Sequence, residues 1–283
     1  APVSGILAVG STGGHKVSLN RMRESRCPAG YQEAIHYSFV DRRQLAEGYH
    51  DHLVLPLAHP VSSVMAVMRT TLLPGLLSSL SRNLRRQQSR VRLFETGVAF
   101  MQKDELEEPE RIAAVAAGNA LPEQWGEASR EVDFFDIKGD VQNLFAMRGD
   151  ESAVVFEAAK LPWMHPGACA VIKMQDKAIG WCGAVHPQVL KAFDIKKNTL
   201  AFEIDLEYLL HREVPYAKEI SRVPSVRRDL ALMLPNDVNY AQVRQCITSA
   251  AGPFLEKVVV FDVYQGENLK IGYKSLAIGL IFN

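Results

Sequence analysis

The alternation of apolar and polar residues predicts short strands interrupted by a few amphipathic helices. β-branched and aromatic residues indicate strands over residues 34–40 and 91–100, and small apolar residues indicate another over 112–117. Leucines at helical spacing over residues 76–84 predict a helix whose opposite side carries arginines, and residues 134–145 fit a second amphipathic helix. The pattern therefore indicates an α+β fold, with an antiparallel sheet and helices packed on it.

The pattern in the rest of the sequence predicts further strands and a second domain. Residues 153–206 alternate strands with turns marked by proline and glycine, and a polar, proline-bearing stretch follows over 214–221. The last segment predicts strand, helix, strand, strand, which is the first part of a ferredoxin-like β-α-β-β-α-β domain. We therefore expect two domains, residues 1–213 and 214–283. The remaining predicted elements are helices over 17–26 and 41–48, strands over 229–234, 258–264 and 272–282, and a helix over 240–251.

Composition and charge narrow the classes of function. The chain of 283 residues has 32 basic and 32 acidic residues, so contact with nucleic acid requires a local patch. No apolar run approaches the roughly 20 residues needed to cross a bilayer, and the first residues do not resemble a signal peptide. The four cysteines form no Cys-x-x-Cys pair, which favours reduced thiols in a cytoplasmic protein. Both ends of the sequence look cut, so we expect a fragment.

Two kinds of chemical site receive little support. His165 and His186, each followed by proline, could meet Cys169 and Cys182, but their spacing is not that of a zinc site. Proline after each histidine favours turns at strand ends instead. A Gly-x-Ser-x-Gly hydrolase elbow is absent from the sequence. We therefore expect neither a metal site nor catalytic residues.

Three short motifs relate the chain to class II aminoacyl-tRNA synthetases. Gly30-Tyr-Gln-Glu33 resembles the first motif, a helix–strand element at subunit interfaces, although the proline expected late in that motif is missing. Arg92-Leu-Phe-Glu95 resembles the second motif, which in catalytic members grips ATP and the amino acid; an exposed cross-strand ion pair is the alternative. The glycine-rich third motif, whose helix carries an arginine for the ATP phosphates, is absent.

The order of longer sequence blocks carries a closer resemblance. These blocks cover residues 30–41, 73–77, 83–97 and 133–140, followed by His-Pro-Gly at 165–167 and His-Pro at 186–187. Together they resemble the C-terminal part of the β subunit of bacterial phenylalanyl-tRNA synthetase. The resemblance implies a class II-like module that has lost its chemistry and scaffolds the catalytic α subunit in an (αβ)2 assembly. ATP and Mg²⁺ would serve the whole complex and not this fragment.

The resemblance also suggests residues that contact each partner. The run Arg-x-Pro-Ser-x-x-Arg-Asp over residues 222–229 resembles the opening of the family's ferredoxin-like anticodon-binding domain, which supports tRNA(Phe). From Tyr216 onward the chain has eight basic and six acidic residues, so its affinity for phosphates should be modest and salt-sensitive. The candidate tRNA-binding residues are Arg222, Arg227, Arg228, Tyr264, Tyr273 and Lys274. The candidate subunit-interface residues are Tyr31, Glu33, Arg82, Arg85 and Arg86.

Two alternative functions stay open at this stage. The chain could be a stand-alone ATP-binding enzyme that uses Arg92 and Glu95 in a class II-like pocket, although the missing third motif counts against it. It could also be a structural interaction module without RNA contact. Because the last helix and strand of the terminal domain are missing, we expect an unpaired sheet edge and poor solubility or self-association of that domain in isolation.

Overall fold

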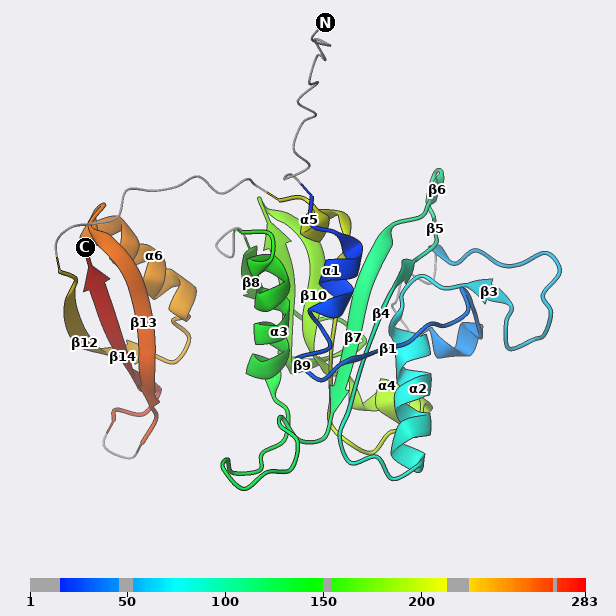
Figure 1. The fold of residues 1–283 in the computed structure, drawn as a ribbon, viewed down its shortest axis with the longest axis horizontal. Coiled ribbons are helices and arrows are strands. Elements are labelled where there is room, and N and C mark those ends of the chain that lie inside the picture. The colour runs from blue at the N-terminus through cyan, green and yellow to red at the C-terminus, as the bar shows by residue number, and fades with distance from the viewer. Residues whose placement is uncertain (1–15, 46–52, 150–153, 213–223, 267–268) are drawn as a thin grey trace, which may run out of the picture. The chain divides into compact units, whose positions relative to one another are not determined.

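The computed structural model divides into two compact units, residues 1–215 and 216–283, which are described separately (Figure 1). It describes residues 16–45, 53–149, 154–212, 224–266 and 269–283. The domain boundary predicted at residue 213, the predicted linker and Arg222 lie outside these ranges. Within them, no helix is long and apolar enough to span a membrane.

A seven-stranded sheet organises the first unit, in the order β1-β4-β7-β11-β10-β9-β8. Strand β1 pairs in parallel with β4, and every other neighbouring pair is antiparallel. The predicted antiparallel sheet is therefore confirmed, with one parallel strand at its edge. The strands are β1 (Gln32–Glu33), β4 (Val91–Val98), β7 (Glu110–Ala117), β8 (Val154–Ala158), β9 (Met164–Met174), β10 (Lys177–Val185) and β11 (Thr199–Asp205).

Helices cover both faces of this sheet (Figure 1). One face, here called the α3 face, packs against α1 (Leu19–Glu24), α3 (Phe134–Ala146) and α5 (Glu207–Leu210). The other, here called the α2 face, packs against α2 (Leu73–Arg85) and α4 (Pro187–Ala192). Because successive strand residues point to opposite faces, each inner strand contributes to both cores.

Strand β7 shows this division most clearly, because it is buried on both sides. Ile112, Ala114 and Ala116 belong to the core on the α3 face. Ala113, Val115 and Ala117 belong to the core on the α2 face. Side chains this small let helices approach the centre of the sheet from both directions.

Helix α3 begins with a capping box, which explains why its predicted start was correct. The Asp133 carboxylate accepts hydrogen bonds from the backbone N–H groups of Phe135 (2.7 Å) and Asp136 (3.1 Å). The Asp136 carboxylate in turn accepts from the Asp133 N–H at 2.9 Å. Both side chains satisfy donors that the first helical turn leaves unpaired.

Three predicted elements differ from the structure. Of the strand predicted over residues 34–40, only β2 (Phe39–Val40) forms; it pairs with β3 (Val67–Met68), and β1 lies just before the predicted range. In place of the helix predicted over 41–48, the described residues form a short 3-10 helix, Arg42–Gln44. Residues 103–111, whose acidic and charged sequence predicts a loop, contain β6 (Leu106–Glu107), which pairs with β5 (Met101–Gln102) in a small hairpin.

The second unit has the predicted β-α-β-β order. Its elements are β12 (Val226–Pro235), α6 (Tyr240–Ala251), β13 (Leu255–Tyr264) and β14 (Tyr273–Phe282). The sheet is antiparallel, in the order β12-β14-β13. Val243 and Ile247 of α6 pack with Leu276, Ile278 and Leu280 of β14, so the helix covers one face of this sheet. The opposite face is here called the open face.

Candidate functional site

Arg92, the first residue of the pair that resembles the second class II motif, is buried on the α3 face. Its Nη1 donates to Oδ2 of Asp140 at 3.3 Å, and its Nη2 donates to the carbonyl oxygen of Ala120 at 3.0 Å. The guanidinium also lies 5.4 Å from the centroid of the Tyr31 ring. Arg26 donates to the backbone carbonyl of Asp140 at 3.0 Å. Arg92 is thus held inside the module by groups of the same chain.

Burial dominates the electrostatics of this cluster. It raises the pKa of Asp140, while the hydrogen bond from Tyr31 and the charges of Arg92 and Arg26 act in the opposite direction. Burial also raises the pKa of the Tyr31 hydroxyl well above its ordinary value and lowers the pKa of Arg26. Each ionised group therefore depends on its neighbours for compensation in the interior.

Glu95, the second residue of the pair, is buried on the α2 face. Its carboxylate accepts from Nη1 of Arg69 at 2.6 Å and lies 2.6 Å from Nδ1 of His36. The other ring nitrogen of His36 lies 2.7 Å from the Ser79 hydroxyl on α2. Gly75 makes room for this approach, since a Cβ at that position would fall 2.7 Å from the imidazole. Every group in this arrangement has a partner within the module.

The structure therefore separates Arg92 from Glu95. Residues three apart on one strand point to opposite sides, as the cores show: Phe94 packs on the α3 face and Leu93 on the α2 face. The two residues cannot line one pocket, so the site assumed for a stand-alone ATP-binding enzyme does not form. The alternative of an exposed cross-strand ion pair is also wrong, because both residues are buried and bound to other groups.

A second buried carboxylate anchors α2 on the same face as Glu95. Glu203 of β11 accepts from the Thr71 hydroxyl at 2.5 Å, from the Leu72 N–H at 3.0 Å and from Nη1 of Arg111 at 2.6 Å. It lies at the N-terminus of α2, where a negative charge is favourable. The α2 face is therefore closed by a helix that is fixed to the sheet.

The candidate interface residues divide by exposure. Tyr31 is only 2% exposed, so its side chain belongs to the interior and not to a subunit contact. Glu33, Arg82, Arg85 and Arg86 lie on the surface, where Glu33 pairs with Arg23 at 3.2 Å and Arg85 with Asp194 at 3.0 Å. A role of these four in subunit contact stays a prediction.

Sequence reasoning missed three exposed apolar residues that follow β1. Ile35 is 88% exposed, Tyr37 73% and Phe39 38%, and we call them the apolar ridge. Between them, His36 turns inward to Glu95, and the Ser38 carbonyl accepts from the Arg69 N–H at 2.9 Å. The sequence does alternate here, but the apolar positions point outward because the His36 side chain between them turns inward to the buried Glu95.

The candidate tRNA-binding residues fall on both faces of the terminal sheet. Residues directly opposite in neighbouring strands share a face. Arg227 is opposite Ile281 and Tyr264 is opposite Ser275, which with Tyr273 places these candidates on the open face. By the same alternation, Arg228 and Lys274 belong to the face that α6 covers.

Arg227 lies across the open face in contact with three neighbours. Its Nε donates to Oδ1 of Asp229 at 2.7 Å, and its guanidinium lies 5.2 Å from the centroid of the Phe261 ring. A Cβ on Gly279 would come within 3.1 Å of the guanidinium, so the glycine leaves space for it. Tyr264 and Phe261 are 45% and 51% exposed, which gives the open face aromatic rings beside a cation.

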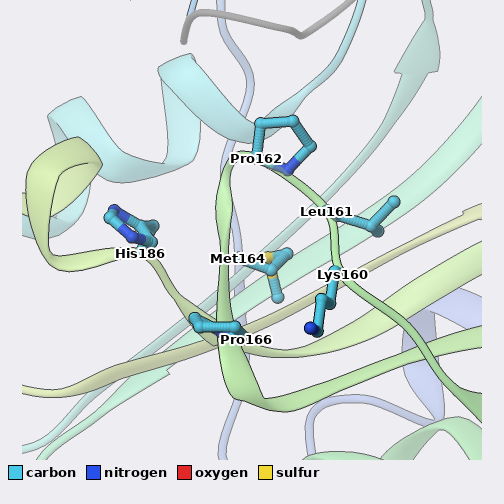
Figure 2. Close-up of a pocket in the computed structure, with 6 residues that line it drawn as sticks. All are labelled: Lys160, Leu161, Pro162, Met164, Pro166 and His186. Atoms are coloured by element: carbon cyan, nitrogen blue, oxygen red, sulfur yellow. The ribbon is translucent and has the colours of Figure 1, made fainter.

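The histidines considered for a metal have local roles instead. Nδ1 of His165 accepts from the Gly167 N–H at 3.1 Å, and Nδ1 of His186 accepts from the Gln188 N–H at 3.2 Å. His186 thereby caps α4 and lies at one side of a shallow cavity of about 300 Å³ (Figure 2). The other residues that line it are Lys160, Leu161, Pro162, Met164 and Pro166.

The two neighbouring cysteines point away from each other. Cys169 packs on the α2 face and Cys182 on the α3 face. Burial raises the pKa of the Cys182 thiol to about 12, so it stays protonated at neutral pH. Across the part of the chain that the structure describes, no three His, Cys, Asp or Glu side chains gather in a group that could hold a metal ion.

Comparison with known proteins adds independent information. The family model "Phenylalanyl tRNA synthetase beta chain CLM domain" matches residues 6–206, and the model "Ferredoxin-fold anticodon binding domain" matches residues 221–283. The phenylalanine–tRNA ligase beta subunit of Xanthomonas oryzae pv. oryzae (strain MAFF 311018) is 44% identical over 254 residues, which cover 88% of this chain and 32% of the relative. The proteins of the same name from Xylella fastidiosa (strain Temecula1) and Pseudoalteromonas translucida (strain TAC 125) are each 40% identical, over 94% and 93% of this chain and 34% of each relative. The chain thus spans about a third of the length of these relatives.

Proposed function

Because the chain belongs to the family of phenylalanyl-tRNA synthetase β subunits, we propose that it is a non-catalytic part of a phenylalanine–tRNA ligase. In this role it scaffolds the catalytic α subunit and helps to position tRNA(Phe). One observation carries the proposal: Arg92 and Glu95 are buried on opposite faces of the sheet and bound to internal partners. The module therefore keeps the framework of a class II fold, with both residues of this pair engaged by its own side chains.

The apolar ridge is the surface that we assign to the α subunit. It follows directly on the segment that resembles the class II interface motif, and it exposes an isoleucine and two aromatic rings side by side along the chain. Rings of this kind supply much of the binding energy at protein interfaces once water is excluded. Exposed Glu33 lies just before the ridge in sequence and can form part of its polar rim.

ATP and Mg²⁺ do not fit the described residues of this chain. The second-motif pair is split between two faces, and the described carboxylates form no cluster suited to a hard cation. We assign both ligands to the rest of an (αβ)2 complex in the cytoplasm. This chain would contribute interface area and the orientation of a long substrate.

For tRNA we assign the open face of the terminal sheet. Arg227 can neutralise a phosphate, and Tyr264 and Phe261 expose rings on which unpaired bases can stack. The match of residues 221–283 to an anticodon-binding model supports this choice. The small charge excess of the region suits a positioning contact more than tight binding.

Co-purification with a bacterial α subunit tests the proposal. We expect a stable complex with this chain, and we expect no ATP binding and no phenylalanyl-adenylate from this chain alone. ATP binding is measured by calorimetry and adenylate formation by pyrophosphate exchange. An adenylate formed by the isolated chain would disprove the non-catalytic assignment, and failure to bind any bacterial α subunit would disprove the scaffold role.

A further inference from the structure

A polar cavity of about 380 Å³ lies on the first unit where β1 meets the start of β4. Its walls carry two guanidinium groups and three side-chain amides, and no carboxylate is among the described residues that line it. The lining residues are Gly30, Gln32, Asn83, Gln88, Arg90, Val91 and Arg92. A cavity of this size and polarity is filled by water or by a polar ligand.

The charges around the cavity are unbalanced. Within the described residues, Arg26, Arg90 and Arg92 lie around Asp140, and a second carboxylate that acts on Asp140 and Arg92, that of Asp136, is already paired with Arg130. Burial and repulsion from Arg92 lower the pKa of Arg90, while Tyr31 and Asp140 only partly offset them. Guanidinium groups in such a setting are stabilised by a further anion.

The hydrogen bonds of the two lining arginines are also incomplete. Nε of Arg90 and Nε of Arg92 are buried without a partner among the described residues. Arg92 already uses both Nη atoms, whereas Arg90 makes one hydrogen bond within the described chain, from Nη2 to the Ala120 carbonyl at 3.2 Å. Gly30, with φ +81°, lies against the Arg90 guanidinium, and a Cβ there would come within 2.8 Å of Nη1. Arg90 is therefore the group best able to receive a ligand.

We propose that this cavity binds an oxyanion, a phosphate or carboxylate group, with Arg90 as its main ligand and Arg92 as a supporting charge. The side-chain amides of Gln32 and Gln88 supply further donors around it. Planar guanidinium groups bind both kinds of oxyanion through charge-assisted hydrogen bonds. The anion can be free in solution, or it can be an acidic side chain of a docked α subunit; the second source rests on the function proposed above.

The first experiment measures the thermal stability of the isolated chain against inorganic phosphate at constant ionic strength, with chloride as the reference salt. Arg90→Gln removes the charge, Arg90→Lys retains it, and Arg21→Gln is the control because Arg21 is exposed and does not line the cavity. If a free oxyanion binds, we expect phosphate to stabilise the wild type in a saturable way. The apparent affinity for phosphate should be at least about tenfold lower in Arg90→Gln and intermediate in Arg90→Lys. General salt effects of phosphate would act on all four proteins alike.

The second experiment measures α-subunit affinity for the same variants. If the anion is a partner carboxylate, Arg90→Gln should weaken the complex by about tenfold or more, while Arg21→Gln leaves it unchanged. Equal phosphate responses in all variants, together with unchanged α-subunit affinity of Arg90→Gln, would overturn the oxyanion site. Because the phosphate experiment uses the chain alone, its result does not depend on whether the proposed function holds.

Discussion

The hydroxyl of Tyr31 donates a 2.7 Å hydrogen bond to Oδ2 of Asp140, which lies 109 residues further along the chain. Arg92 donates to the same oxygen at 3.3 Å. Tyr31 belongs to the segment that resembles an interface motif. Its hydrogen bond joins the residues before β1 to helix α3 inside the protein. It holds that segment in place, while the residues after it, Ile35, Tyr37 and Phe39, stay exposed.

Tyr31→Phe should lower the free energy of unfolding by about 1–2 kcal/mol, because it removes one donor from a buried carboxylate. Urea unfolding measures this change. Tyr37→Phe is the matched control, since Tyr37 is 73% exposed, and it should change stability by less than about 0.5 kcal/mol. Equal stability of the two variants would contradict the buried role of Tyr31.

Replacing the ridge residues Ile35 and Tyr37 together by serine should weaken binding to the α subunit by about tenfold or more. Their exposure means that the unfolding free energy should hardly change. Val61→Ser is the control, because Val61 is 91% exposed but lies outside the ridge. Unchanged affinity in a surface-based binding assay would remove the ridge from the interface.

Glu95→Gln should lower the free energy of unfolding by roughly 3 kcal/mol, because Arg69 loses its buried counter-ion. Glu107→Gln, which breaks an exposed pair with Lys103, should cost less than about 1 kcal/mol. Denaturant titration compares the two variants. A small effect of Glu95→Gln, combined with ATP binding by the wild type, would mean that Glu95 serves a ligand and not the fold.

Asp136 should make the free energy of unfolding of the first unit decrease at acidic pH. The hydrogen bond from Arg130 is the largest of the effects that hold the pKa of Asp136 below its ordinary value of 3.8. Since the folded state binds this proton less tightly than the unfolded state, the stabilisation is fully present above about pH 4 and is lost as the pH falls through the lower folded value. Asp136→Asn should therefore cost about 1 kcal/mol at pH 6, and its difference from the wild type should shrink towards pH 3.

Glu131→Gln is the control for that pH series, because Glu131 is exposed on the surface just before α3. Its difference from the wild type should stay small across the same range. A gap between Asp136→Asn and the wild type that does not narrow in acid would show that the Asp136 carboxylate does not stabilise the helix start.

Arg227→Ala should weaken tRNA(Phe) binding and lower the salt dependence of log K by about one unit of slope, as expected for one lost phosphate contact. Arg228→Ala should have a smaller effect, because its strand position belongs to the face that α6 covers. Filter binding over a range of salt concentrations separates the two. If neither variant differs from the wild type, the chain is a structural module without RNA contact.

Much of the fold follows from local pattern. The leucine stripe predicts α2, the capping residues Asp133 and Asp136 mark the start of α3, and the order of elements in the second unit agrees with a ferredoxin-like domain. These features depend on spacing within a single element, which the sequence displays directly.

The arrangement around Arg92 and Glu95 could be predicted only in part. Strand alternation already places residues three apart on opposite sides, so the separation of the pair was available from the sequence. The partners were not: Asp140, Arg69 and His36 come from distant segments, and no spacing rule connects them. The outward direction of Ile35 and Tyr37 depends on these same partners, because they draw the polar neighbours inward.

Strand β7 restricts which substitutions the module can accept, because it is buried on both faces. Its alanines limit how far each helical layer stands from the sheet, so one added methyl group would displace a helix on one side, and changes at adjacent positions would displace helices on both. The residue types tolerated in α2 and α3 are therefore linked through a strand whose side chains lie in both cores, although the two helices lie on opposite faces. Sequence drift in one layer is then restricted by the other, so the shape of the module can be retained whatever its residues do chemically.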